Sequence, residues 1–389
     1  MAIPLRYNIR NVMQRPVSTL TTAVGIGLTV TILIAALSLA AGFQASLRET
    51  GSLDNALLLR SGADSEISSG ISRQAVDIVR SNPAVALGPD GRPMVSAEVV
   101  VLTNKPRLGQ PGSSNLTVRG VDPAALNVRH EVKIVAGRAF TPGTDEVIVG
   151  RRIAPRFEDT KIGDRIQFQK RTFTVVGHFS ADGSSFESEI WGDVAVMAPA
   201  FGREDAYQSV TFRMKDPSRF KQIETEMKRD PRLQVQVRRE RDFYAEQSQL
   251  LSTLIRVLGV FITVIMALGA MFGAMNTMYA AVGSRTREIA TLLVLGFTPL
   301  AIMTSFLFES VFLALLGGVL GCLLALPING ITTSTTNFQS FSEVAFAFRV
   351  TPIAMAIGLV FALLMGVGGG LLPAIRAARQ PLAAALRQM

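Results

Sequence analysis

The residues of this chain that could perform acid–base or metal chemistry are few and far apart. The two histidines, His130 and His178, lie in unrelated strand or turn contexts and lack the His-Glu-x-x-His spacing of a zinc site. The single cysteine, Cys322, excludes an intrachain disulfide and a cysteine-based zinc site. The Gly-x-Ser-x-Gly pattern of hydrolases is also absent. We therefore expect a protein that is not an enzyme and that holds no metal or cofactor of its own.

Glycine-rich sequence does occur, but in the wrong context for nucleotide binding. The chain has no Gly-x-x-x-x-Gly-Lys-Ser/Thr loop to hold a phosphate group. Gly366 and the three glycines at 368–370 lie inside an apolar stretch, where small residues allow helices to pack closely. The sequence thus predicts helix packing at these glycines and no ATP binding through such a loop.

One acidic residue, Glu309, lies inside an otherwise charge-free apolar stretch. Ionisable groups within a membrane segment are candidates for function, so one hypothesis is a proton or substrate relay. A relay usually needs a chain of acids or histidines, and none is visible here. We favour the other hypothesis, a buried hydrogen bond between helices to Asn276 or Thr277, in which case Glu309→Gln costs stability more than transport.

Four stretches are free of charge apart from Glu309. They are residues 16–47, 257–284, 289–342 and 350–375. A membrane-spanning helix needs about 20 apolar residues, and the third stretch holds one helix and a polar loop. The sequence predicts four spanning helices, one before and three after a segment of roughly 200 residues. The first apolar run exceeds the usual length of a signal-peptide core, so we expect it to be a retained helix.

Arginine placement predicts the orientation of these helices. Basic residues precede the first helix, follow the last and lie in the loop between the second and third, whereas the loop at 328–349 has only Arg349. The positive-inside rule then places both termini in the cytoplasm and the large domain outside. The net charge of +9 reflects this topology, and no basic run interleaved with aromatics indicates nucleic-acid binding.

The large domain alternates strand and helix patterns. Strand–helix–strand patterns at 56–103 and 209–237 predict a split βαβ sheet that both halves of the domain close. The helix at 71–80 has Ser69 or Ser72 as its possible cap. Between the two patterns, glycine-punctuated strands at about 132–200 predict a β-rich insertion.

The segment between the second and third helices is the strongest local signal. A charged start followed by apolar residues on one helical face predicts a helix at the membrane surface that docks into a partner's groove. The alternative is a membrane helix that extends past the bilayer. The residues of the segment are Arg285, Arg287, Glu288, Ile289, Leu292, Leu293 and Gly296.

Several motifs resemble one known family. Residues 287–296 (REIATLLVLG) closely resemble the R-E-I-(G/A)-x-L-x-x-x-G segment of MacB/FtsX-type ABC transporter permeases, also called type VII. Residues 309–321 (ESVFLALLGGVLG) resemble the third helix of that family. Residues 373–387 (PAIRAARQPLAAALR) are similar to its C-terminal tail, with Pro381 one position early. Short motifs at 137–140, 162–164 and 175–177 resemble its extracytoplasmic domain.

The resemblance implies a permease subunit of the inner membrane of a bacterium that works as a dimer with a second copy or a paralogue. It also implies a separate cytoplasmic ABC ATPase, which would bind ATP and magnesium and contact the coupling segment at 282–299. ATP hydrolysis would move the outer domain to export or extract a drug, peptide, lipid or lipoprotein. Further partners implied are a periplasmic adaptor or lipoprotein and membrane lipid. The alternative function is mechanotransmission that regulates an extracytoplasmic hydrolase or sensor.

The predicted fold is an α-helical membrane protein with four transmembrane helices in a 1 + 3 arrangement and an α+β extracytoplasmic domain. Its predicted parts are a cytoplasmic amphipathic helix at 1–16, transmembrane helix 1 at 17–42, the extracytoplasmic domain at 43–250, transmembrane helix 2 at 254–281, the coupling segment at 282–299, transmembrane helix 3 at 300–327, an outer loop at 328–350, transmembrane helix 4 at 351–376 and a cytoplasmic tail at 377–389.

Overall fold

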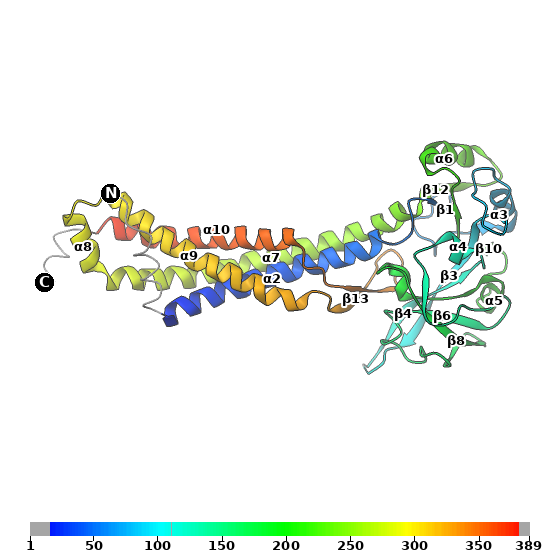
Figure 1. Ribbon diagram of the computed structural model, residues 1–389, viewed down its shortest axis with the longest axis horizontal. Coiled ribbons are helices and arrows are strands. Elements are labelled where there is room, and N and C mark those ends of the chain that lie inside the picture. Colours follow the sequence, from blue (N-terminus) through cyan, green and yellow to red (C-terminus); the bar gives the residue numbers. More distant parts are fainter. Residues whose placement is uncertain (1–15, 110, 381–389) are drawn as a thin grey trace. The chain divides into compact units, whose positions relative to one another are not determined.

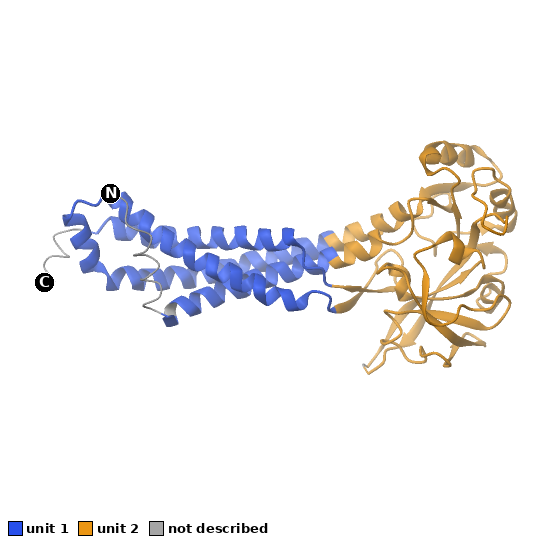
Figure 2. Cartoon of the chain, viewed as in Figure 1, with its two compact units in different colours: residues 1–41, 253–331, 348–389 blue, residues 42–252, 332–347 orange. Residues whose placement is uncertain are grey.

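The computed structural model describes residues 16–109 and 111–380, and it divides into two compact units (Figures 1 and 2). The first, the helical unit, comprises the described residues of 1–41, 253–331 and 348–389. The second, the sheet unit, comprises the described residues of 42–252 and 332–347. The amphipathic helix predicted near the N-terminus and the tail beyond residue 380 lie outside the described residues.

Four helices in the described chain are long and apolar enough to cross a membrane. They are α2 (Pro16–Arg48), α7 (Glu240–Ser284), α9 (Pro299–Ala325) and α10 (Pro352–Ala378). The starts of α9 and α10 follow from local sequence, because Thr298 and Thr351 each accept a hydrogen bond from a backbone amide three residues ahead. A proline follows each threonine at the first helical position, where it costs no hydrogen bond.

Close packing in the helical unit depends on small residues, as the sequence predicted. A Cβ atom added at Gly370 would lie 2.4 Å from the Ser310 side chain, and one at Gly366 would lie 2.6 Å from Ala314. The Ser310 hydroxyl donates a 2.7 Å hydrogen bond to the Gly366 carbonyl. Larger side chains at these positions would force α9 and α10 apart.

The sheet unit contains two strand–helix–strand segments that share one sheet. The first is β1 (Asn55–Arg60), α3 (Arg73–Arg80) and β3 (Val95–Pro106), and the second is β11 (Ser209–Arg213), α6 (Phe220–Arg229) and β12 (Val235–Arg239). The strand order is β12-β1-β11-β3, and each neighbouring pair is antiparallel. The strands of the two segments therefore interleave, so neither segment forms a sheet alone.

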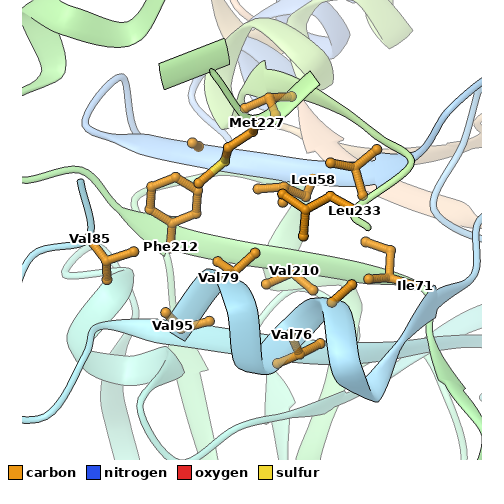
Figure 3. Packing of buried hydrophobic residues seen from close by; sticks show 14 of the residues in the cluster. Leu58, Ile71, Val76, Val79, Val85, Val95, Val210, Phe212, Met227 and Leu233 are labelled. Atoms are coloured by element: carbon orange, nitrogen blue, oxygen red, sulfur yellow. The ribbon is translucent and has the colours of Figure 1, made fainter. Parts of the chain in front are cut away.

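One apolar cluster covers this part of the sheet (Figure 3). Val79 of α3, Phe212 of β11 and Met227 of α6 all belong to it and are buried. The Ser72 side chain accepts a hydrogen bond from the Ala75 amide at the start of α3, so Ser72 is the cap, one of the two residues predicted.

The long strand β3 links this region to the other half of the sheet. Residues 95–98 pair with β11, whereas residues 99–106 pair with β4 (Ser113–Val121). Beyond β4 the order continues β9-β6-β8-β5, with β7 on β8. The bounds are β5 (Lys133–Gly137), β6 (Glu146–Gly150), β7 (Arg165–Phe168), β8 (Arg171–Ser180) and β9 (Glu189–Asp193). Shorter elements are β2 (Ile71–Ser72), α4 (Ala125–Val128), η1 (Ser185–Ser188), α5 (Val194–Ala200), β10 (Ala206–Tyr207), η2 (Pro217–Arg219) and η3 (Leu326–Ile328).

The segment predicted as an outer loop at 328–350 contains a β-hairpin. Its strands are β13 (Thr332–Thr336) and β14 (Glu343–Ala347), and both belong to the sheet unit. Asn337 donates a 2.9 Å hydrogen bond to the Gln247 side chain, and the Ala345 amide donates one of the same length to Ser188. The β-branched threonines of β13 favour a strand, although their polarity resembles that of a loop.

Candidate functional site

The predicted coupling segment forms a short helix of its own. Helix α7 ends at Ser284, and α8 (Thr286–Val294) follows after Arg285, whose backbone is not helical at φ −110° and ψ 18°. Gly296 adopts φ +91°, which favours glycine, and two backbone hydrogen bonds to residues 292 and 293 close the end of α8. Gly296 therefore sets where the helix stops.

The predicted docking residues of α8 lie on different sides of it. Ile289 is buried in an apolar cluster of the helical unit, and Leu293 packs against the same cluster. Leu292 is half-buried, whereas Arg287 and Glu288 are exposed. Val294, the last residue of α8, and Leu295, directly after it, are also exposed, and the sequence did not predict either as a docking residue.

Glu309 of α9 forms an ion pair that the sequence analysis did not name. Its carboxylate oxygen lies 2.8 Å from Nη1 of Arg285, and both side chains are buried. Of the partners proposed from sequence, Asn276 is exposed, and Thr277 donates its hydroxyl to the Ala274 carbonyl. The pair joins the break between α7 and α8 to α9.

A second group of charged residues lies inside the sheet unit, and the sequence analysis missed it. We call this group the charge network. Each member is almost inaccessible to solvent: Glu66, Glu98, Arg119, Arg129, Glu189 and Glu240. Charged residues are seldom fully buried unless they are paired, so six together indicate a specific structural role.

The two arginines of the network share Glu98 of strand β3. Arg119 of β4 contacts one Glu98 oxygen at 2.8 Å, and Arg129 contacts both oxygens, the shared one at 3.1 Å. Arg119 also holds Glu189 with two hydrogen bonds, at 2.7 and 2.9 Å. Nε of Arg129 donates to Glu240 at 2.6 Å. Such paired guanidinium–carboxylate contacts are strong and fix the orientation of both groups.

The first turns of α7 supply part of this network. Glu240 is the first residue of the helix, and its second oxygen accepts a 2.8 Å hydrogen bond from Asn55 of β1. Tyr244, one turn later, donates its hydroxyl to Glu66 at 3.0 Å. The Arg129 guanidinium lies 4.9 Å from the ring centre of Phe186. These contacts tie the start of α7 to the sheet.

The network has four carboxylates and only two guanidinium groups, and the environments of the carboxylates differ. Burial alone raises the pKa of Glu66, but the charge of Arg119 and hydrogen bonds from Arg119 and Ser209 outweigh it and leave the pKa lowered. Burial also raises the pKa of Glu189, and there the raised value persists despite Arg119. Beside the network lies a cavity of about 30 Å³, large enough for a water molecule.

The sequence contains one signal for this network. Glu98 and Arg119 are single charges inside the apolar strand sequences at 95–101 and 116–121. A lone charge inside a buried strand requires a partner, which sequence alone does not identify. In residues 16–109 and 111–380 no group of three or more His, Cys, Asp or Glu residues could hold a metal ion.

Comparisons with known proteins give two family matches. Residues 19–230 match the family model of the MacB-like periplasmic core domain, and residues 260–382 match that of the FtsX-like permease C-terminal region. The macrolide export ATP-binding/permease protein MacB 1 of Yersinia pestis is 28% identical over 321 residues, which cover 76% of this chain and 48% of that protein. The ABC transporter permease YknZ of Bacillus subtilis is 26% identical over 290 residues, 70% of each chain. The chain thus spans about half the length of the MacB relatives that it matches.

Two solved structures are also similar. The periplasmic region of MacB from Actinobacillus actinomycetemcomitans has a TM-score of 0.38 at 13% identity, and covers 52% of this chain and 96% of that chain. The extracellular domain of YknZ has a TM-score of 0.36 at 15% identity, and covers 47% and 99%. The periplasmic core family model alone covers more than half of the sequence. The chain therefore belongs to the MacB/FtsX-type family of ABC transporter permeases.

Proposed function

We propose that this permease couples ATP hydrolysis by a cytoplasmic ABC ATPase to movement of the sheet unit, and that this movement exports or extracts a substrate. The ATPase, which would bind ATP and magnesium, lies outside residues 1–389 in this proposal. Both termini and α8 would be cytoplasmic, and a second permease copy or paralogue would complete the transporter. The names of two relatives support export over regulation of a hydrolase: the macrolide exporter MacB 1, and the pyoverdine export ATP-binding/permease protein PvdT of Pseudomonas fluorescens, which is 33% identical over 232 residues.

Helix α7 is the observation that carries the proposal. It is one uninterrupted helix of 45 residues, Glu240–Ser284. Its first turns are held in the charge network, and its last residue precedes Arg285, which pairs with Glu309. A hydrogen-bonded helix resists stretching, and buried ion pairs fix its ends. A displacement of α8 would therefore pass along α7 into the sheet.

The proposal can be tested by purifying the full chain from its native membrane in mild detergent. We expect an ABC ATPase to co-purify in a stoichiometric ratio and the eluate to hydrolyse ATP. The decisive variant is Leu295→Asp, because Leu295, directly after α8, is 67% exposed. A carboxylate buried there against the ATPase would lack a partner, so we expect recovery of the ATPase to fall about tenfold or more.

Leu87→Asp is the matched control. Leu87 is 65% exposed and lies in the sheet unit, so the same chemical change there should leave recovery of the ATPase unaltered. An ATPase that co-purifies equally well with both variants would contradict the role of α8. A chain that elutes without any ATPase, under conditions that preserve a known ABC complex, would contradict the proposal as a whole. Co-elution of an extracytoplasmic hydrolase would favour regulation over transport.

A further inference from the structure

A polar groove of about 480 Å³ lies in the sheet unit. Its walls come from the end of β3, the turn at 151–156 and the β13–β14 hairpin. The polar residues that line it are Arg107, Arg156, Thr332, Thr333, Ser334 and Glu343. Two guanidinium groups and three consecutive hydroxyls therefore meet in one groove with a single carboxylate.

The carboxylate is already occupied by protein groups. Arg107 lies 2.6 Å from one oxygen of Glu343, whereas Arg156 lies 3.8 Å from the other, beyond hydrogen-bond distance. Burial raises the pKa of Glu343, but hydrogen bonds from the Ser114 and Ser334 hydroxyls and the charge of Arg107 outweigh it and leave the pKa lowered. Glu343 is thus ionised, and the groove carries one net positive charge.

Arg156 is the group that remains unsatisfied. In the part of the chain that the structure describes, its side chain has no hydrogen bond to protein, although only 24% of it is exposed. Burial, and after it the positive charge of Arg107, lower its pKa despite Glu343. A guanidinium has five donors in a planar fork that matches carboxylate or phosphate oxygens. An anion in the groove would satisfy these donors and neutralise the excess charge.

We propose that this groove binds the phosphate group of an anionic ligand, with Arg156 on two phosphate oxygens and the hydroxyls of Thr332 and Thr333 on the others. Arg107 stays on Glu343 and holds that carboxylate away from the ligand. A phospholipid headgroup and free phosphate share this chemistry. Two observations favour the lipid: exposed Leu108 lines the same groove, and Thr332 follows a candidate membrane span by only four residues of chain. Ligand binding in this groove does not depend on the proposed coupling to an ATPase.

The test uses the full chain in detergent and measures bound ligand by native mass spectrometry. The probes are inorganic phosphate, dihexanoyl phosphatidylglycerol and dihexanoylglycerol, which has the same acyl chains without a phosphate group. We expect phosphatidylglycerol to bind in a 1:1 ratio and Arg156→Gln to weaken its binding about tenfold or more. Arg156→Lys, which keeps the charge without the planar fork, should bind with intermediate affinity.

Arg151→Gln is the matched control, because Arg151 is 52% exposed, pairs with Glu187 and does not line the groove. Phosphatidylglycerol binding that exceeds phosphate binding would identify the lipid, and equal binding would identify free phosphate. The proposal would be overturned if neither phosphate nor phosphatidylglycerol bound, or if dihexanoylglycerol bound as well as phosphatidylglycerol. It would also be overturned if Arg156→Gln bound phosphatidylglycerol as tightly as the wild type. The fluorescence of Trp191, which is buried in the same unit, verifies that each variant is folded.

Discussion

Replacing Arg129 by methionine is expected to lower the free energy of unfolding of the sheet unit by about 3–5 kcal/mol. Arg129 is fully buried and contacts Glu98 and Glu240, which are also fully buried. Methionine fills a comparable volume but leaves both carboxylates without this cation. A buried charge that loses its partner keeps its desolvation cost and forfeits the compensating attraction.

The sequence provides a local probe for this measurement. Trp191 is the only tryptophan, it is buried, and its indole N–H donates to Glu189 of the same network at 2.7 Å. Its fluorescence during urea unfolding of the full chain in detergent therefore reports on the sheet unit. Because Trp191 also lies close to Arg129, unfolding midpoints should be compared and absolute intensities should not.

Arg138→Met is the matched control for Arg129→Met. Arg138 also pairs with a glutamate, Glu146, but its side chain is 56% exposed. Exposed ion pairs contribute at most about 1 kcal/mol, so this variant should unfold close to the wild-type midpoint. If the two variants lost equal free energy of unfolding, burial would not set the strength of the network. The charge network could then not be the anchor of α7.

The same change also tests the mechanical role of the network. Arg129 holds Glu240, and Glu240 is the first residue of α7. If α7 transmits movement to the sheet, a loosened first turn should reduce transport more than it reduces ATP hydrolysis by the partner. A parallel loss of both would indicate instability alone.

Hydropathy predicted the membrane part of this fold well, for a physical reason. Four stretches of sufficient length and apolarity lead to four helices, because a span must be long, apolar and internally hydrogen-bonded. The cap at Ser72 and the packing glycine at 366 were also predictable, because each depends on its immediate neighbours in the sequence or on the absence of a side chain.

Long-range pairing was not predictable in the same way. Arg119 and Glu189 are 70 residues apart, and Arg129 and Glu240 are 111 residues apart. No periodicity in the sequence connects them, since their contact depends on which strands become neighbours. The periodic face of α8 shows a related limit: it indicates that Ile289 is buried but not whether its own chain or a partner covers it. The structure packs it on its own chain.

The ion pair between Arg285 and Glu309 leads to the second large effect. Glu309→Gln removes the charge that faces a buried arginine, and we expect a cost of about 3–5 kcal/mol in the helical unit. Cys322 is the only cysteine and is buried in an apolar cluster of the same unit, so its reaction with a maleimide reports opening of that unit. Since about 1.4 kcal/mol is a factor of ten, labelling of the full chain in detergent should accelerate by roughly two to four orders of magnitude.

The companion variants decide what the pair does. The double variant Arg285→Gln with Glu309→Gln removes both charges, so it should label more slowly than Glu309→Gln alone. Asn276→Leu changes an exposed polar residue of α7 and should label like the wild type. Rapid labelling in Glu309→Gln, reversed in the double variant, identifies a structural pair that fixes the start of α8. A Glu309→Gln protein that labels slowly but no longer transports would instead establish Glu309 as a relay.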